Sequence, residues 1–179
     1  ANTTGDRNTA IGAYALRTNT VGQYNTAVGL SALCTNLTGF FNVAVGSCTM
    51  RLNSGGDSNV AIGDNTMCSN TTGRCNVALG VVTMRDNTTG QQNVAVGGGS
   101  MAYNNIGSRN TTVGIDALRS NRTGGCNVAV GHAALCLSNI GNTSSTAHTA
   151  VGTYALRLNT TGTSNVAFGS RALETNSTG

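Results

Sequence analysis

The 179-residue chain has no proline, tryptophan or lysine, and only 9% of its residues are charged and 4% aromatic. It contains no apolar run near the roughly 18 residues that a membrane-spanning helix needs, so we expect no membrane insertion. All ten positive charges are arginines spread along the chain, so the net charge of +4 gives little support to nucleic-acid binding. Abundant Asn, Thr, Ser and Gly keep the surface hydrated despite the low charge.

Catalytic and metal-binding patterns are also missing. The two histidines, His132 and His148, are too few for a metal site, and none of the six cysteines forms a C-x-x-C motif. No Ser-His-Asp set, carboxylate pair or phosphate-binding glycine loop stands out. We therefore expect neither an enzyme nor a bound cofactor.

What the chain does contain is one pattern repeated ten times. Asn-x-Ala-Val-Gly-x-x-Ala-Leu-x-x-Asn-x-Thr-Gly-x-x returns every 17 residues from Asn8 and resumes at His148 after four extra residues. Counted from the Asn that opens each repeat, glycine stands at position 5 and at position 15 in every copy. A fixed short period is typical of a solenoid, in which each repeat packs on its neighbours.

The residue types within the repeat predict β-structure. Positions 2 and 4 carry β-branched or apolar residues around a small position 3, as in a short strand, and position 9 is always Leu or Met. The two glycine columns mark turns and argue against helix. We predict an all-β protein, a β-solenoid (parallel β-roll) of ten 17-residue coils, each with two short strands and two turns. Residues 1–179 would form one solenoid, with a loop insertion at 142–147.

Side-chain alternation along a strand assigns the faces of each coil. Placing the large residues inside puts positions 2, 4 and 9 in the interior and leaves the alanine of position 3 and the glycine of position 5 outside. A smooth Ala/Gly stripe would suit close packing against a sister chain. Open solenoid ends also recruit strands. We therefore expect self-association, as a homo-oligomer or filament, along the stripe formed by Ala27, Ala44, Ala61, Ala78 and Ala95.

Asparagine recurs at positions 1 and 12, which suggests stacked amide ladders. Position 12 also holds most of the Asn-x-Ser/Thr sequons, so a row of N-linked glycans on one turn is the competing interpretation. The candidate glycosylation sites are Asn2, Asn36, Asn70, Asn87, Asn110, Asn121, Asn142, Asn159 and Asn176.

Position 10 alternates between arginine and other residues, so the true period is two coils. This arginine row is either solvated or available for inter-chain salt bridges or anionic ligands.

Six cysteines suit an oxidising, extracellular setting. Pairing of sequence neighbours is one of 15 connectivities, and free or inter-chain thiols remain open. The candidate disulfide residues are Cys34, Cys48, Cys68, Cys75, Cys126 and Cys136.

The strings NTAIG, NVAVG and NVALG resemble the S-V-A-I-G repeats of trimeric autotransporter adhesin heads, which are left-handed parallel β-rolls with shorter coils. The longer string from Asn159 to Gly169 is similar to repeats in tail-fibre-like surface proteins. The resemblance implies surface display and attachment, without a cofactor.

We thus expect an extracellular or cell- or virion-surface rod, such as an adhesin or fibre shaft. The expected partners are further copies of the chain, and glycans or a cell surface. Because both ends of the chain fall inside the repeat, we interpret the sequence as a segment of a longer molecule. The rival interpretation is an ice-binding solenoid with an Asn/Thr ladder face, although Val21, Gly55, Ile106 and Ile140 interrupt the threonine row at position 14.

Overall fold

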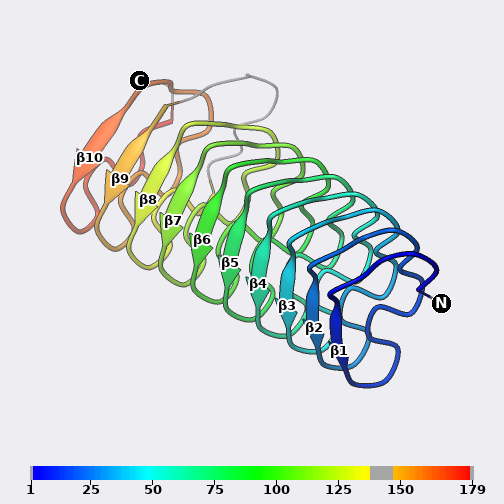
Figure 1. Ribbon diagram of the computed structural model, residues 1–179. Coiled ribbons are helices and arrows are strands. Elements are labelled where there is room, and N and C mark those ends of the chain that lie inside the picture. The colour runs from blue at the N-terminus through cyan, green and yellow to red at the C-terminus, as the bar shows by residue number, and fades with distance from the viewer. Residues whose placement is uncertain (1, 138–146, 178–179) are drawn as a thin grey trace.

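The computed structural model describes residues 2–137 and 147–177 and shows a β-solenoid in which every coil contributes one short strand (Figure 1). The strands stack in chain order into a single ten-stranded parallel sheet. This confirms the predicted fold class and repeat length. The strands are β1 (Thr9–Ile11), β2 (Thr26–Val28), β3 (Val43–Val45), β4 (Val60–Ile62), β5 (Val77–Leu79), β6 (Val94–Val96), β7 (Thr111–Val113), β8 (Val128–Val130), β9 (Thr149–Val151) and β10 (Val166–Phe168).

The pairing register follows the repeat without a slip. Val43 pairs with Val60, seventeen residues later, and the same offset holds from β1 to β8. Between β8 and β9 the offset is twenty-one, since Val128 pairs with Thr149. The four extra residues therefore leave the sheet unbroken, as predicted. The predicted insertion at 142–147 lies outside the described residues except for Ala147.

The second predicted strand of each coil is wrong. Beyond the three strand residues, the described part of each coil contains turns, bends and unassigned backbone but no second strand. Left-handed backbone occurs at positions 7, 9 and 17, mostly at residues other than glycine, for example Cys48, Met50 and Ser58 with φ of 53°, 49° and 57°. These corners cost roughly 1–2 kcal/mol per residue in isolation. They persist because the coils above and below fix the path of the backbone.

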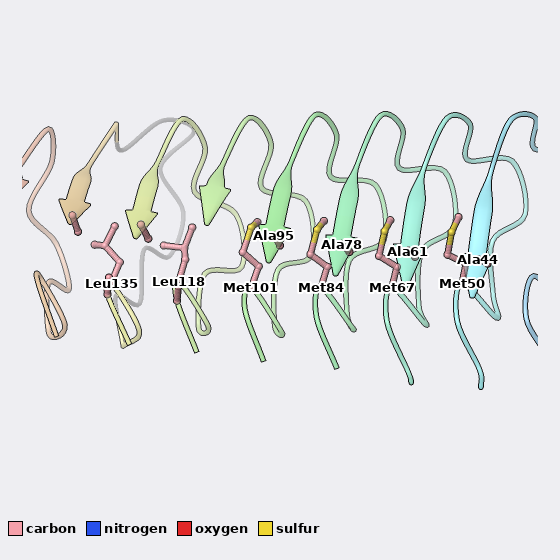
Figure 2. Close-up of a cluster of buried hydrophobic side chains, with 14 of the residues drawn as sticks. Ala44, Met50, Ala61, Met67, Ala78, Met84, Ala95, Met101, Leu118 and Leu135 are labelled. Carbon is pink, nitrogen blue, oxygen red and sulfur yellow. The ribbon is translucent and has the colours of Figure 1, made fainter. Parts of the chain in front are cut away.

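The interior of the coil is lined by positions 3 and 9, not by positions 4 and 9. Position 3 is completely buried from β2 to β9, as alanine in every strand except β7, where the buried residue is Thr112. Position 9 is buried as predicted from Leu16 to Leu156, while Leu173 of the last coil is 48% exposed. Figure 2 shows the methionines of position 9 beside the alanine column inside the coil. Position 4 faces outward, where Ile62 and Val113 are each 43% exposed. The predicted exterior Ala/Gly stripe is therefore wrong, because Ala27, Ala44, Ala61, Ala78 and Ala95 form part of the core.

The asparagine at position 1 explains this reversal. Its side chain is buried, and positions 1, 3 and 5 share one face of an extended strand. Alanine must then point inward with it, while positions 2 and 4 point outward. The narrow interior accepts one large side chain per coil, the Leu or Met of position 9, and the small alanine packs against it.

The two glycine columns serve different needs. At position 5, Gly46 has φ of 134°, and an added Cβ would lie 2.4 Å from the carbonyl oxygen of Gly63 in the next coil. At position 15 no left-handed φ is involved. A Cβ on Gly39 would instead lie 2.4 Å from Asn36 Oδ1 and 2.5 Å from the Gly56 carbonyl oxygen. Position 15 is glycine because its backbone lies directly against the asparagine ladder and the next coil.

Candidate functional site

Two asparagine columns cross-link the coils from inside. At position 12, Asn53 Nδ2 donates to Asn36 Oδ1 of the preceding coil at 2.7 Å and to the Gly56 carbonyl at 3.0 Å. At position 1, Asn42 Nδ2 donates to Asn25 Oδ1 at 3.1 Å and to the same Gly56 carbonyl at 2.8 Å. The position-15 carbonyl thus accepts from both columns, which confirms the expected ladders and joins them within each coil.

These ladders weigh against glycosylation at most of the candidate sequons. An N-linked sugar replaces one Nδ2 hydrogen and needs a path to solvent, but in the ladder Nδ2 donates twice and the side chain is completely buried. Asn2 is exposed and Asn176 half-buried, while Asn142 lies outside the described residues. Occupancy in the native source stays a prediction. The buried candidates are Asn36, Asn70, Asn87, Asn110, Asn121 and Asn159.

The cysteines are all free thiols, so none of the sequence-neighbour pairings is formed in the structure. Cys75 and Cys126 are exposed, whereas Cys34 and Cys136 are buried. Burial raises the pKa of the Cys136 thiol, and the nearby Asp116 carboxylate acts in the same direction. A raised pKa disfavours the reactive thiolate.

The arginine row at position 10 is largely engaged within the chain. Arg85 holds Asp86 through two hydrogen bonds of 2.7 and 2.8 Å, and this pairing raises the arginine pKa. Arg119 Nε lies 3.5 Å from Asp116 Oδ1, and Arg157 Nε lies 3.1 Å from Glu174 Oε1. The row is therefore partly neutralised by its own acids rather than a free anionic-ligand stripe.

The outer face of the sheet is a feature that our sequence reasoning placed inside. Positions 2 and 4 form two outward columns that contain only Val, Thr, Ile, Leu and Phe in all ten coils. Val94 is 37% exposed at position 2 and Ile62 43% at position 4. Position 6 extends this apolar face at Leu30, Val81 and Ile115. A continuous uncharged sheet face of this kind is typical of an interaction surface.

A second missed feature interrupts the repeat at the sixth coil. Gly98, Gly99 and Ala102 occupy positions 6, 7 and 10, where the flanking coils carry larger side chains. Their absence leaves a cavity of about 430 Å³, which we call the coil-6 notch, bounded by residues of the fifth and seventh coils. The signal in the sequence was the coincidence of three small residues in one coil.

The notch has a defined polar edge. Tyr103 lies beside it, with the guanidinium carbons of Arg85 and Arg119 at 5.2 and 5.4 Å from its ring centre. The backbone of Gly98 and Gly99 forms the floor of the notch. A Cβ built on Gly99 would lie 2.4 Å from Asp116 Oδ1, so this carboxylate lies directly above Gly99. On the other side of Tyr103 a smaller cavity of about 210 Å³ is lined partly by Arg122 and Asp86.

His148 replaces asparagine in the position-1 ladder. It is completely buried, and its Nδ1 accepts a hydrogen bond from the Asn165 backbone N–H at 3.1 Å. Burial lowers the pKa of this imidazole, and a hydrogen bond with the Gly162 backbone opposes that shift. Because Nδ1 must keep its lone pair, the ladder requires a neutral ring at this coil.

The remaining findings are negative and concern the described residues alone. Within residues 2–137 and 147–177 no group of three or more His, Cys, Asp or Glu side chains could hold a metal ion. Nor does that part of the chain include a helix able to cross a bilayer. Comparison with protein-family models, curated proteins and solved structures finds no match. The resemblance to adhesin heads therefore rests on the repeat motif alone.

Proposed function

We propose that this chain is a non-enzymatic structural rod, the shaft of an extracellular fibre or surface adhesin. The observation that supports this most directly is the unbroken register of the parallel sheet from β1 to β10 together with two internal asparagine ladders. The sheet joins each coil to the next along the described length, and the ladders add side-chain links from Asn2 to Asn121 and from Asn8 to Asn127. Ten strands at a spacing of about 4.8 Å make a rod about 43 Å long between β1 and β10.

The outer sheet face would join such rods side by side. Its two columns repeat at the strand spacing, so a second copy offers columns of the same period, and neither column carries a charge that contact would have to desolvate. The strand face measures roughly 43 by 10 Å, or about 430 Å². A standard interface buries about 800 Å² per partner. The apolar side chains of position 6, such as Val81 and Ile115, supply additional area.

Light scattering over a range of concentrations tests this association. Changing Ile62 and Val113 together to Lys should leave the coils folded, since both side chains point outward, and should convert associated material to monomer. Changing Ala61 to Arg serves as the contrasting variant. It places a charge in the core and should unfold the coil. Material that is monomeric at high concentration and unaffected by the two lysines would overturn self-association through this face.

The ice-binding alternative has less support in the geometry. The asparagine columns lie inside, so they offer no face to ice. Outer threonine hydroxyls are also engaged: Thr18, Thr35 and Thr71 donate to backbone carbonyls of the next coil at 2.8–3.0 Å. Thermal hysteresis measured on the monomeric protein decides this alternative, and a clear freezing-point gap would favour it over the rod.

A further inference from the structure

We propose that the coil-6 notch is a binding site for a single phenolic ring. Its volume of about 430 Å³ falls within the range of small-ligand pockets, about 300–1,000 Å³. It is also a local departure from a repeat that otherwise fills these positions. The site is independent of the proposed structural role, since a rod does not require it.

The shape of the notch suits a flat ring. The position-6 side chain is missing at Gly98, between Val81 of the fifth coil and Ile115 of the seventh, so the opening is one coil spacing thick, about 4.8 Å. The protein itself shows that an aromatic ring fits this spacing. Tyr24 and Phe41, at the same position of neighbouring coils, stack with their ring centres 4.9 Å apart. A ring inserted edge-on would thus take the place of the missing side chain, in contact with apolar walls.

The polar edge selects the substituent. Asp116 Oδ1 and Arg119 Nε lie 3.5 Å apart, a looser pair than the short contacts between Arg85 and Asp86. A hydroxyl between them can donate its hydrogen to the carboxylate and accept one from the guanidinium. Arg85 is paired with Asp86 and Arg119 with Asp116, so these four groups sum to zero charge. A neutral ligand is therefore favoured over an anion.

The open part of the notch lies above Gly98, because the Asp116 carboxylate occupies the space over Gly99. A Cβ added to Gly98 would meet only the Val81 carbonyl oxygen, at 3.8 Å, so the space above Gly98 is open. Both carbonyls of Gly98 and Gly99 and the Gly99 N–H are already hydrogen-bonded, since Gly99 N–H donates to Val81 O and Gly98 O accepts from Asp116 N–H, each at 3.0 Å, and Gly99 O accepts from Ala102 N–H at 3.1 Å. Recognition is therefore assigned to the apolar walls, Asp116 and Arg119.

Titration of the protein with p-cresol, followed by amide NMR shifts, tests the assignment. We expect saturable shifts at Gly98, Gly99 and Ala102. Toluene, which lacks the hydroxyl, should bind on the order of tenfold more weakly, since about 1.4 kcal/mol of hydrogen bonding corresponds to a factor of ten. Absence of shifts at these amides overturns the site. Equal binding of toluene overturns the role assigned to Asp116 and Arg119.

A variant that fills the notch shows whether p-cresol binds there and not elsewhere on the protein. Gly98→Val introduces the residue that the fifth coil carries at position 6, Val81, into open space, so the fold should persist and the p-cresol shifts should vanish. Ala13→Val makes a corresponding change in the first coil, where it should leave binding unchanged. Undiminished binding by Gly98→Val would refute the notch as the site.

A second probe distinguishes a free phenol from the tyrosine side chain of a partner protein. N-acetyl-tyrosinamide carries the same ring on a peptide backbone. If it binds at least as tightly as p-cresol, the phenol is the tyrosine side chain of a partner protein. If only p-cresol binds, the ligand is a free phenol.

Discussion

Replacing Asn53 with Ala should break both sides of a buried ladder at one coil. Asn53 donates to Asn36 Oδ1 at 2.7 Å and to the Gly56 carbonyl at 3.0 Å, and it accepts from Asn70 Nδ2 at 2.7 Å. All three asparagines are completely buried. Water therefore cannot replace the lost partners without opening the coil.

The expected loss of stability depends on which polar groups lose their hydrogen-bond partners. The Gly56 carbonyl keeps its second donor, Asn42 Nδ2, at 2.8 Å. Asn36 Oδ1 loses its ladder donor, and one hydrogen of Asn70 Nδ2 loses its acceptor. Each buried orphan costs about 1–3 kcal/mol, so the free energy of unfolding should fall by about 2–6 kcal/mol. This is a large part of the stability of a typical domain.

Urea unfolding combined with hydrogen exchange measures this loss. A solenoid can open coil by coil, and a single urea midpoint averages the stability of all coils. The hydrogen-exchange rates of amides in the second to fourth coils show instead whether the loss of stability is local. The control is Asn105→Ala at an exposed position, which should change stability by no more than about 0.5 kcal/mol. If Asn53→Ala is no more harmful than this control, the ladder does not hold the coils together.

Four further variants test other parts of the structure. Gly39→Ala should destabilise by about 3 kcal/mol, because its Cβ would press on the Gly56 carbonyl oxygen at 2.5 Å, whereas Gly98→Ala should be nearly neutral in a urea titration. Val82→Asn should stabilise by about 1 kcal/mol, since Val82 has φ of 60° and Asn65 adopts the same region one coil earlier; an unchanged or lower unfolding midpoint would contradict this. Burial lowers the pKa of His148, so its contribution is fully present above the ordinary value of 6.5 and is lost as the pH falls through the lowered folded-state value. Unfolding measured at neutral and mildly acidic pH should show this loss, and His148→Asn should remove that part of the pH dependence.

The repeat period, the parallel stacking and the Leu/Met column were readable from the sequence, because a solenoid imposes the same environment on equivalent positions. The interior face was assigned wrongly because side-chain size was used as the guide. The buried polar group at position 1 is the stronger constraint: an asparagine that pairs with the same residue in the next coil orients the whole strand. Had Asn42 been placed inside, Ala44 would have followed by alternation.

The turns could not be predicted from residue type. Met50 and Val82 adopt left-handed backbone although neither residue favours it. Their conformation comes from the neighbouring coils, which a local pattern does not encode. The coil-6 notch was readable in principle, because Gly98, Gly99 and Ala102 depart from the repeat in one coil. Its polar edge depends on where Asp116 and Arg119 lie in the next coil.

The asparagine ladders also give the rod a direction. Backbone hydrogen bonds between coils run both ways, since Thr26 N–H donates forward to Asn42 O and Gly29 N–H donates back to Ile11 O. The ladder amides from Asn19 to Asn127 all donate backward, each Nδ2 to the Oδ1 of the coil before it. Their dipoles are therefore aligned, and chains of aligned hydrogen bonds polarise one another. The ladders therefore contribute an aligned dipole whose positive end points toward the first coil and whose negative end points toward the last. This dipole favours opposite directions for two rods that lie side by side.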